Sequence, residues 1–427
     1  MDKQLEPYKY KDQVEIPALG WIDDIITVSE SGYKTSRMNV FINAQLAIKK
    51  LRLGAKKCVT LHVGKHHEEY KHVQLFVDGW SVKNVESYDA EETKWEDTHD
   101  QDMKEISHLD SEKYLGQILS SDSKNTNNIT KLRNKGIGIK NKIIQILHNI
   151  PGGVYHFELA MIFRSSYLLS SILSNSEVWY GITKSEIELL ERLDVNLLQE
   201  VSECSRSVPH ELYYLEFGVL PISYIIKIRK QMFLHHILHQ EEQSLLYRFF
   251  MAQLNSPTKG DWATEVLQDT KYLDLNLDLE DIKNMPKSSF RRIVETKTTQ
   301  KALEYLLEKQ GSRNSEHAKG KLLSYDELKM AEFLSPSQVD ISIEEKKWLI
   351  KCRFEDIDIS CNNRWKNENL YCTNCILTEI DQQHLFLCNS LLGKNEIVGN
   401  LPVYEDLYLK VIYIISQQFI QKWTGVT

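Results

Sequence analysis

The sequence has no apolar run long enough to cross a bilayer, which takes about 18 residues. Its most apolar long stretch, YLLSSILSNSEVWYG at 167–181, is too short and too polar for that purpose. The first residues, MDKQLEPYKYKDQVEIP, are charged and lack the apolar core of a secretory signal peptide. Cysteine is scarce too, since seven cysteines are spread over 427 positions, and this odd number argues against a disulfide framework. These absences predict an intracellular protein of the cytoplasm or nucleus, not secreted and without a membrane partner.

The charge of the chain is negative overall but unevenly distributed. Acidic residues outnumber basic ones by 60 to 52, giving a net charge of −8, which argues against nucleic-acid binding by bulk attraction. Acidic side chains concentrate at 86–112, whereas basic side chains form islands at 131–142, 227–230 and 287–297. Such islands are either phosphate-binding surfaces or ordinary solvated helix faces, and the sequence leaves both interpretations open.

Hydrophobic periodicity divides the chain into an α+β part and a helical part. Strand, turn and strand are predicted at 14–20, 21–24 and 25–29, and a helix at 35–54. Two further strands are predicted at 58–64 and 73–79. From about residue 127 the pattern is mostly helical, with helices predicted at 129–150, 155–181, 184–203 and 221–240 and further helical segments across 277–310. The predicted fold class is therefore α+β, mainly α.

A cysteine and histidine cluster near the C-terminus has the spacing of a zinc site. Cys372 and Cys375 are three positions apart, and His384 and Cys388 would share one face of a helix. Thiolate and imidazole ligands suit zinc better than magnesium or calcium. Because four protein ligands leave no position for water, the predicted site is structural. A redox CxxC pair or simple core cysteines are the alternatives.

Several blocks of the sequence, in order, resemble reverse transcriptases of LINE-type (non-LTR) retrotransposons. GWIDDIITVS resembles the metal-binding hairpin of that family, with Trp21 where tyrosine or phenylalanine is usual. MNVFINAQLAIKKLRLGAKKC resembles the helix and lysine-bearing loop that follow, and KYLGQIL the hairpin associated with gripping the primer. SILSNSEVWYGIT is similar to a thumb segment, and LEFGVLPISYIIKIRKQMFLHHIL to the stretch beyond the thumb. The cysteine and histidine cluster resembles the family's C-terminal zinc knuckle.

The resemblance implies roles for individual residues. Asp23 would bind magnesium or manganese directly with assistance from Asp24, and the two ions would stabilise charge during phosphoryl transfer. Lys57 would donate a proton to pyrophosphate, although Lys56 is a rival and a solvent-facing lysine is an open alternative. RNA and DNA template–primer is the implied partner, and its phosphates would contact the basic residues of the thumb helix. These are Lys131, Arg133, Lys135, Lys140 and Lys142.

The same resemblance implies a palm remnant, a helical thumb, a helical connector and a zinc-knuckle tail. Their predicted ranges are 1–117, 118–245, 246–365 and 366–427. The family's catalytic centre also uses an aspartate and fingers upstream of the hairpin, and Asp23 lies too near Met1 to leave room for them. We therefore expect a polymerase fragment that is inactive alone, unless a longer product or partner chain supplies the missing N-terminal half. The alternatives are a non-catalytic RNA- or DNA-binding module and a zinc-stabilised helical protein with no nucleic-acid role.

Overall fold

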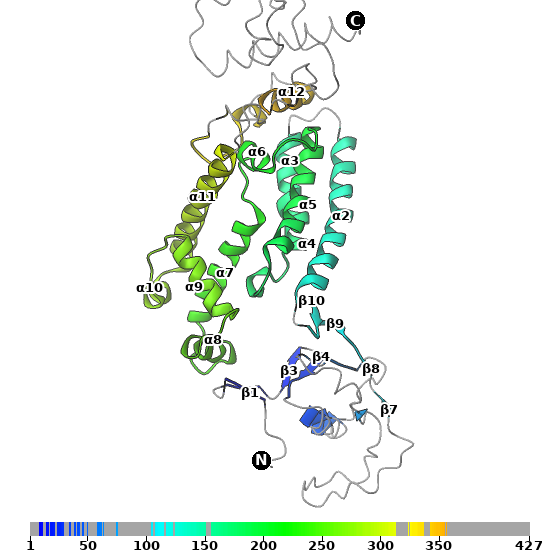
Figure 1. Ribbon diagram of the computed structural model, residues 1–427, viewed down its shortest axis with the longest axis vertical. Helices are drawn as coiled ribbons and strands as arrows, with labels where there is room; N and C mark the ends of the chain where they lie inside the picture. The colour runs from blue at the N-terminus through cyan, green and yellow to red at the C-terminus, as the bar shows by residue number, and fades with distance from the viewer. Residues whose placement is uncertain are drawn as a thin grey trace, which may run out of the picture. The chain divides into compact units, whose positions relative to one another are not determined.

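The computed structural model describes 8–11, 14–16, 18–21, 24–29, 34–35, 38–39, 41–42, 45–46, 49, 58–61, 63, 74–75, 104–105, 107–114, 117–122, 124–150, 155–312, 323, 325–336, 342–354 and 356. The described part is mainly helical, which confirms the predicted class, and its strands are short (Figure 1). None of its helices is both long and apolar enough to span a bilayer. The described residues fall into two compact units, which are treated separately below.

The strands pair in twos within the described part of the chain. β3 (Ala18–Trp21) and β4 (Asp24–Thr27) are antiparallel with Trp21 opposite Asp24, which confirms a hairpin at the predicted turn. The strand predicted at 14–20 is two strands, because its first residues form β2 (Val14–Ile16), which pairs with β1 (Tyr8–Tyr10). β9 (Ser111–Tyr114) and β10 (Gln117–Ser120) form a second hairpin, over the KYLGQIL block. The other pairs are β5 (Val59–Thr60) with β8 (Ser107–His108), and β6 (Gln74–Leu75) with β7 (Lys104–Glu105).

The helices agree closely with the hydrophobic periodicity. The predicted helices at 129–150, 184–203 and 221–240 correspond to α2 (Thr126–Asn149), α5 (Lys184–Ser202) and α7 (Ile222–Leu238). The stretch predicted as one helix at 155–181 is subdivided, whereas the helical segments expected across 277–310 correspond to α10 (Leu279–Asn284) and α11 (Lys287–Gly311). The subdivided stretch consists of α3 (His156–Phe163), the π-helix η7 (Arg164–Leu169), α4 (Ser170–Ile172) and the 3-10 turn η8 (Ser176–Val178). The remaining helices are α6 (His210–Glu216), α8 (Leu245–Asn255), α9 (Trp262–Tyr272), η9 (Glu332–Leu334) and α12 (Ile343–Arg353).

Unit 1 comprises residues 1–131, 175–186 and 229–290. Its N-terminal hairpin packs on α8, because the Tyr10 ring stacks on Phe249 with centroids 4.1 Å apart. Val14 and Ala252 are buried in the same small core. The Lys11 ammonium lies 2.5 Å from an Asp261 carboxylate oxygen. Residues some 240 positions apart in the sequence are thus joined by one aromatic stack and one ion pair.

Unit 2 comprises residues 132–174, 187–228 and 291–427. Its described helices form a bundle in which α2, α3, α4 and α5 lie side by side (Figure 1). The helices pack closely at Gly136, since a Cβ at that position would lie 2.5 Å from Leu193 and 2.7 Å from Ile172. The core of the bundle includes an ion pair in which Arg164 donates to both carboxylate oxygens of Asp194, at 2.7 and 2.6 Å. Both residues are buried, so the two charges depend on each other.

Candidate nucleic-acid interface

Helix α2 carries a run of basic residues in its middle, at 131–142. Its 24 residues contain four lysines, one arginine and no aspartate or glutamate, in a chain whose net charge is −8. The other polar residues are mostly asparagines, which add hydrogen-bonding groups without negative charge. A helix of this composition attracts phosphate without an acidic side chain of its own to repel it.

Helical geometry separates an apolar stripe of α2 from a basic face. Ile129, Leu132, Ile143 and Leu147 are buried. At 100° per residue, Lys131, Lys135 and Lys142 project together from a face that lies roughly a quarter to a third of a turn away. Because the apolar stripe holds the helix to its neighbours, these lysines are presented to solvent by the fold.

The five predicted phosphate-binding residues differ in their surroundings. Lys135 and Lys142 are exposed, whereas Lys131 and Arg133 are partly buried. None of these four forms an ion pair with any carboxylate in the part of the chain that the structure describes. Lys140 differs, because its ammonium is largely buried and paired with Glu200 of α5. Lys140 is therefore neutralised within the bundle, and the exposed part of the basic face consists of Lys135 and Lys142, with the partly buried Lys131 beside them.

The other predicted site residues fall almost entirely outside the described residues. Asp24 opens β4, but Asp23 and Lys57 are not described, nor are Cys372, Cys375, His384 and Cys388. Among the described residues, no three histidine, cysteine or acidic side chains are close enough to hold a metal ion. The donor set of the C-terminal cluster fits zinc by its chemistry, since three thiolates and an imidazole can bind it tetrahedrally. The metal-site predictions remain predictions.

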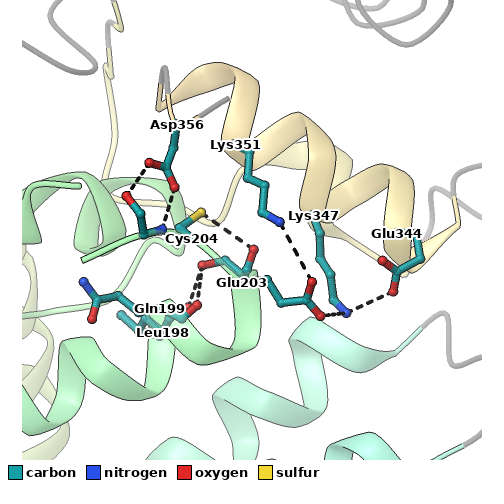
Figure 2. Close-up of polar contacts among 10 residues, drawn as sticks. Leu198, Gln199, Glu203, Cys204, Glu344, Lys347, Lys351 and Asp356 are labelled. Carbon is teal, nitrogen blue, oxygen red and sulfur yellow. Dashed lines mark hydrogen bonds and ion pairs between the residues drawn. The ribbon is translucent and has the colours of Figure 1, made fainter. Parts of the chain in front are cut away.

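A cluster of charged residues that the sequence did not indicate lies at the end of α5 in unit 2. Figure 2 shows the Glu203 carboxylate between Lys347 and Lys351 of α12, with its oxygens 2.6 and 3.9 Å from their ammonium nitrogens. The hydrogen bond from Lys347 is the main reason why the pKa of Glu203 lies below its ordinary value. Burial acts to lower the pKa of Lys347, but hydrogen bonds to Glu203 and Glu344 outweigh it and raise that pKa. No sequence pattern links positions so far apart.

Further contacts beside Glu203 fasten α12 to the rest of unit 2. The Ser205 backbone N–H donates to Asp356 at 2.5 Å, and the Ser205 hydroxyl donates to the other carboxylate oxygen. Burial raises the pKa of the neighbouring Cys204 thiol to about 12, so the thiol stays protonated at neutral pH. Arg353 adds a hydrogen bond of 2.7 Å to the buried carboxylate of Glu216. The cluster therefore holds α12 to the rest of the bundle through paired charges.

Comparisons with known proteins found no matching protein-family model, no matching curated protein and no matching solved structure.

Proposed function

We propose that the chain derives from the reverse transcriptase of a LINE-type (non-LTR) retrotransposon and binds nucleic acid through α2. The observation that carries the proposal is the basic face of α2, which has no acidic residue and presents lysines without carboxylate partners among the described residues. Support for the ancestry comes from the order of the blocks, with a double-aspartate hairpin, a second hairpin and then a basic helix. The two hairpins, β3–β4 and β9–β10, have the local structure that the resemblance implies.

Salt-dependent binding of RNA and DNA tests the proposal. The affinity falls as salt rises, and each phosphate contact that a variant loses should make the plot of log affinity against log salt less steep. The magnitude of the slope should decrease by about 0.9 on duplex DNA and about 0.7 on single strands. We expect Lys135→Ala combined with Lys142→Ala to weaken binding and to decrease the magnitude of this slope by about 2 on duplex DNA. The matched control is Lys259→Ala with Lys271→Ala, which removes the same charge from exposed positions in unit 1. Equal effects of the two pairs would contradict a role for α2, and no salt-sensitive binding would favour a helical protein without a nucleic-acid role.

Polymerase chemistry is tested separately by primer extension on an RNA template with magnesium or manganese. The family's metal site uses a further carboxylate besides those of the hairpin, so we propose that Asp23 and Asp24 by themselves do not support primer extension. Asp23 and Asp24 would hold magnesium or manganese only once that site is completed. Extension that disappears in Asp23→Ala would show that another carboxylate of the chain completes the site.

The zinc knuckle is the third part of the proposal. We expect purified protein to contain about one zinc ion per chain, held by Cys372, Cys375, His384 and Cys388. Elemental analysis should show that Cys375→Ser loses the metal and that Cys58→Ser, a cysteine remote in sequence from the cluster, retains it. Zinc-free wild-type protein, prepared without chelators, would contradict a structural site.

A further inference from the structure

The π-helix η7 of unit 2 combines a fixed inner side with an exposed aromatic ring. Arg164 begins it and is held in the core by Asp194 and by the backbone carbonyl of Leu220, which accepts a hydrogen bond of 3.0 Å. Leu168 and Leu169, near its end, are also buried. Between these anchors, the Tyr167 side chain is 60% exposed. π-helical turns are rare and are often found at functional sites.

The ring of Tyr167 is oriented before any ligand binds. Phe163 meets it edge to face, with centroids 5.8 Å apart and planes at 65°. The Ser170 hydroxyl donates to the backbone carbonyls of Ser166 and Tyr167, which stabilises the backbone of this turn. An exposed ring whose orientation is set by a neighbour loses little conformational freedom when another flat group stacks on it.

The position of η7 beside α2 places this ring near the basic face. Gly136 of α2 lies against Leu168 and Ile172 within unit 2. Lys135 directly precedes Gly136, and Tyr167 directly precedes Leu168. The helical periodicities of α2 and η7 turn both side chains toward the same flank of the α2–η7 pair. Residues 123–175 contain seven lysines or arginines and one carboxylate, Glu158. Two of these cations, Lys140 and Arg164, are paired with Glu200 and Asp194 of α5.

We propose that η7 and α2 form a binding site for single-stranded nucleic acid, with a base stacked on Tyr167 and phosphates near Lys135 and Lys142. The inference rests on the proposed function and names the class of ligand. A duplex keeps its base faces stacked on one another and offers nothing to an exposed ring, whereas an unpaired base has a free face. The basic face alone would bind either form, so the ring is the feature that discriminates between them.

Fluorescence anisotropy with labelled oligonucleotides of about 15 nucleotides tests the inference. The probes are single-stranded oligo(dT), oligo(rU) and a DNA duplex of the same length, so that DNA, RNA and duplex binding are measured apart. Since a stacked base contributes about 1–3 kcal/mol, Tyr167→Ala should weaken single-strand binding by roughly tenfold and leave duplex binding within about twofold. Tyr167→Phe keeps the ring and should bind as the wild type does. Tyr155→Ala, which removes a comparably exposed tyrosine of unit 2, should have no effect.

The outcomes separate this inference from the proposed function. Salt-sensitive binding that depends on Lys135 and Lys142 but not on Tyr167 would overturn the inference alone, as would equal losses on single strand and duplex. No binding of any probe by the wild type would overturn both. Ultraviolet crosslinking of wild-type protein to bromouracil-substituted single strands provides a readout that needs no variant. A crosslink at Tyr167 supports the site, and crosslinks confined to other positions contradict it.

Discussion

Replacing Gly136 with alanine tests how closely α2 packs against the other helices of unit 2. Gly138, two positions further along the same helix, provides a matched control. An ideal Cβ at Gly136 lies 2.5 Å from a Leu193 methyl carbon and 2.7 Å from an Ile172 methyl carbon, whereas one at Gly138 meets nothing within 4 Å. The two substitutions add the same atom to the same helix and differ in the space around it.

The expected magnitudes follow from two opposing effects. In a helix interior, glycine to alanine stabilises by about 1 kcal/mol, and this gain applies to both positions. At Gly136 the new methyl group also forces buried side chains apart, and overpacking of this kind costs about 1–3 kcal/mol. We therefore expect Gly138→Ala to be more stable than the wild type, and Gly136→Ala to be less stable than Gly138→Ala by about 1–3 kcal/mol.

Urea unfolding followed by circular dichroism measures both free energies under the same conditions. The slope of the free energy of unfolding against urea should not change, so that a shift in midpoint reports stability. Equal stabilisation by the two substitutions would mean that a methyl group fits at Gly136. The close contact of α2 with Leu193 and Ile172, and the placement of η7 beside the basic face, would then be wrong.

Four further substitutions test contacts within the units. The lysine partner of Glu203 lowers the pKa of its carboxyl group. The contribution of this ion pair to folding stability is therefore present above the ordinary pKa of 4.5 and is lost as the pH falls through the lowered value. The melting temperature of Glu203→Gln should accordingly fall less on acidification than that of the wild type. Asp194→Asn leaves its buried arginine partner without a carboxylate and should cost about 3–5 kcal/mol in urea unfolding. Gly181 and Gly218 share a φ of +61°, but only at Gly218 would a Cβ meet backbone atoms of 325–336, the nearest at 2.0 Å. Gly181→Ala should cost only the strain of this conformation, about 1–2 kcal/mol, whereas Gly218→Ala should cost more and should speed proteolysis in 325–336.

The helices could be predicted from the sequence because their periodicity is a local property. α5 illustrates this, since Leu190, Leu193, Leu197 and Val201 recur at helical spacing and are all buried. The interruption of the helix after Phe163 could not be predicted in this way, because a π-turn depends on which side chains the neighbouring helices accept. The hairpin of β3 and β4 was likewise accessible, since its turn residues and strands lie close together in the chain, whereas the hairpin of β1 and β2 was not predicted.

The candidate site was predictable only in part, for the same reason. Composition located the basic helix, but not the fact that Lys140 is paired with Glu200, a residue 60 positions away. The charged cluster around Glu203 joins side chains 144 positions apart and has no local signal. Nor did the sequence distinguish Tyr167 from the other tyrosines of the chain, because its exposure follows from the packing of η7. Pairing and exposure are tertiary properties, whereas periodicity and charge density can be read along the chain.

The buried ion pair and the exposed tyrosine of η7 are best understood together. Burying Arg164 and Asp194 carries a large desolvation cost, and apolar residues of similar volume often stabilise a core as well or better. The charged pair fixes the rotation of the segment about its own axis, which is the register meant here. Any other rotation would separate Arg164 from its carboxylate in a medium of low dielectric constant. The residues that follow on the same six-residue turn inherit that register. The direction in which Tyr167 projects is thus set from inside the bundle, which is what the proposed stacking of an unpaired base on this ring requires.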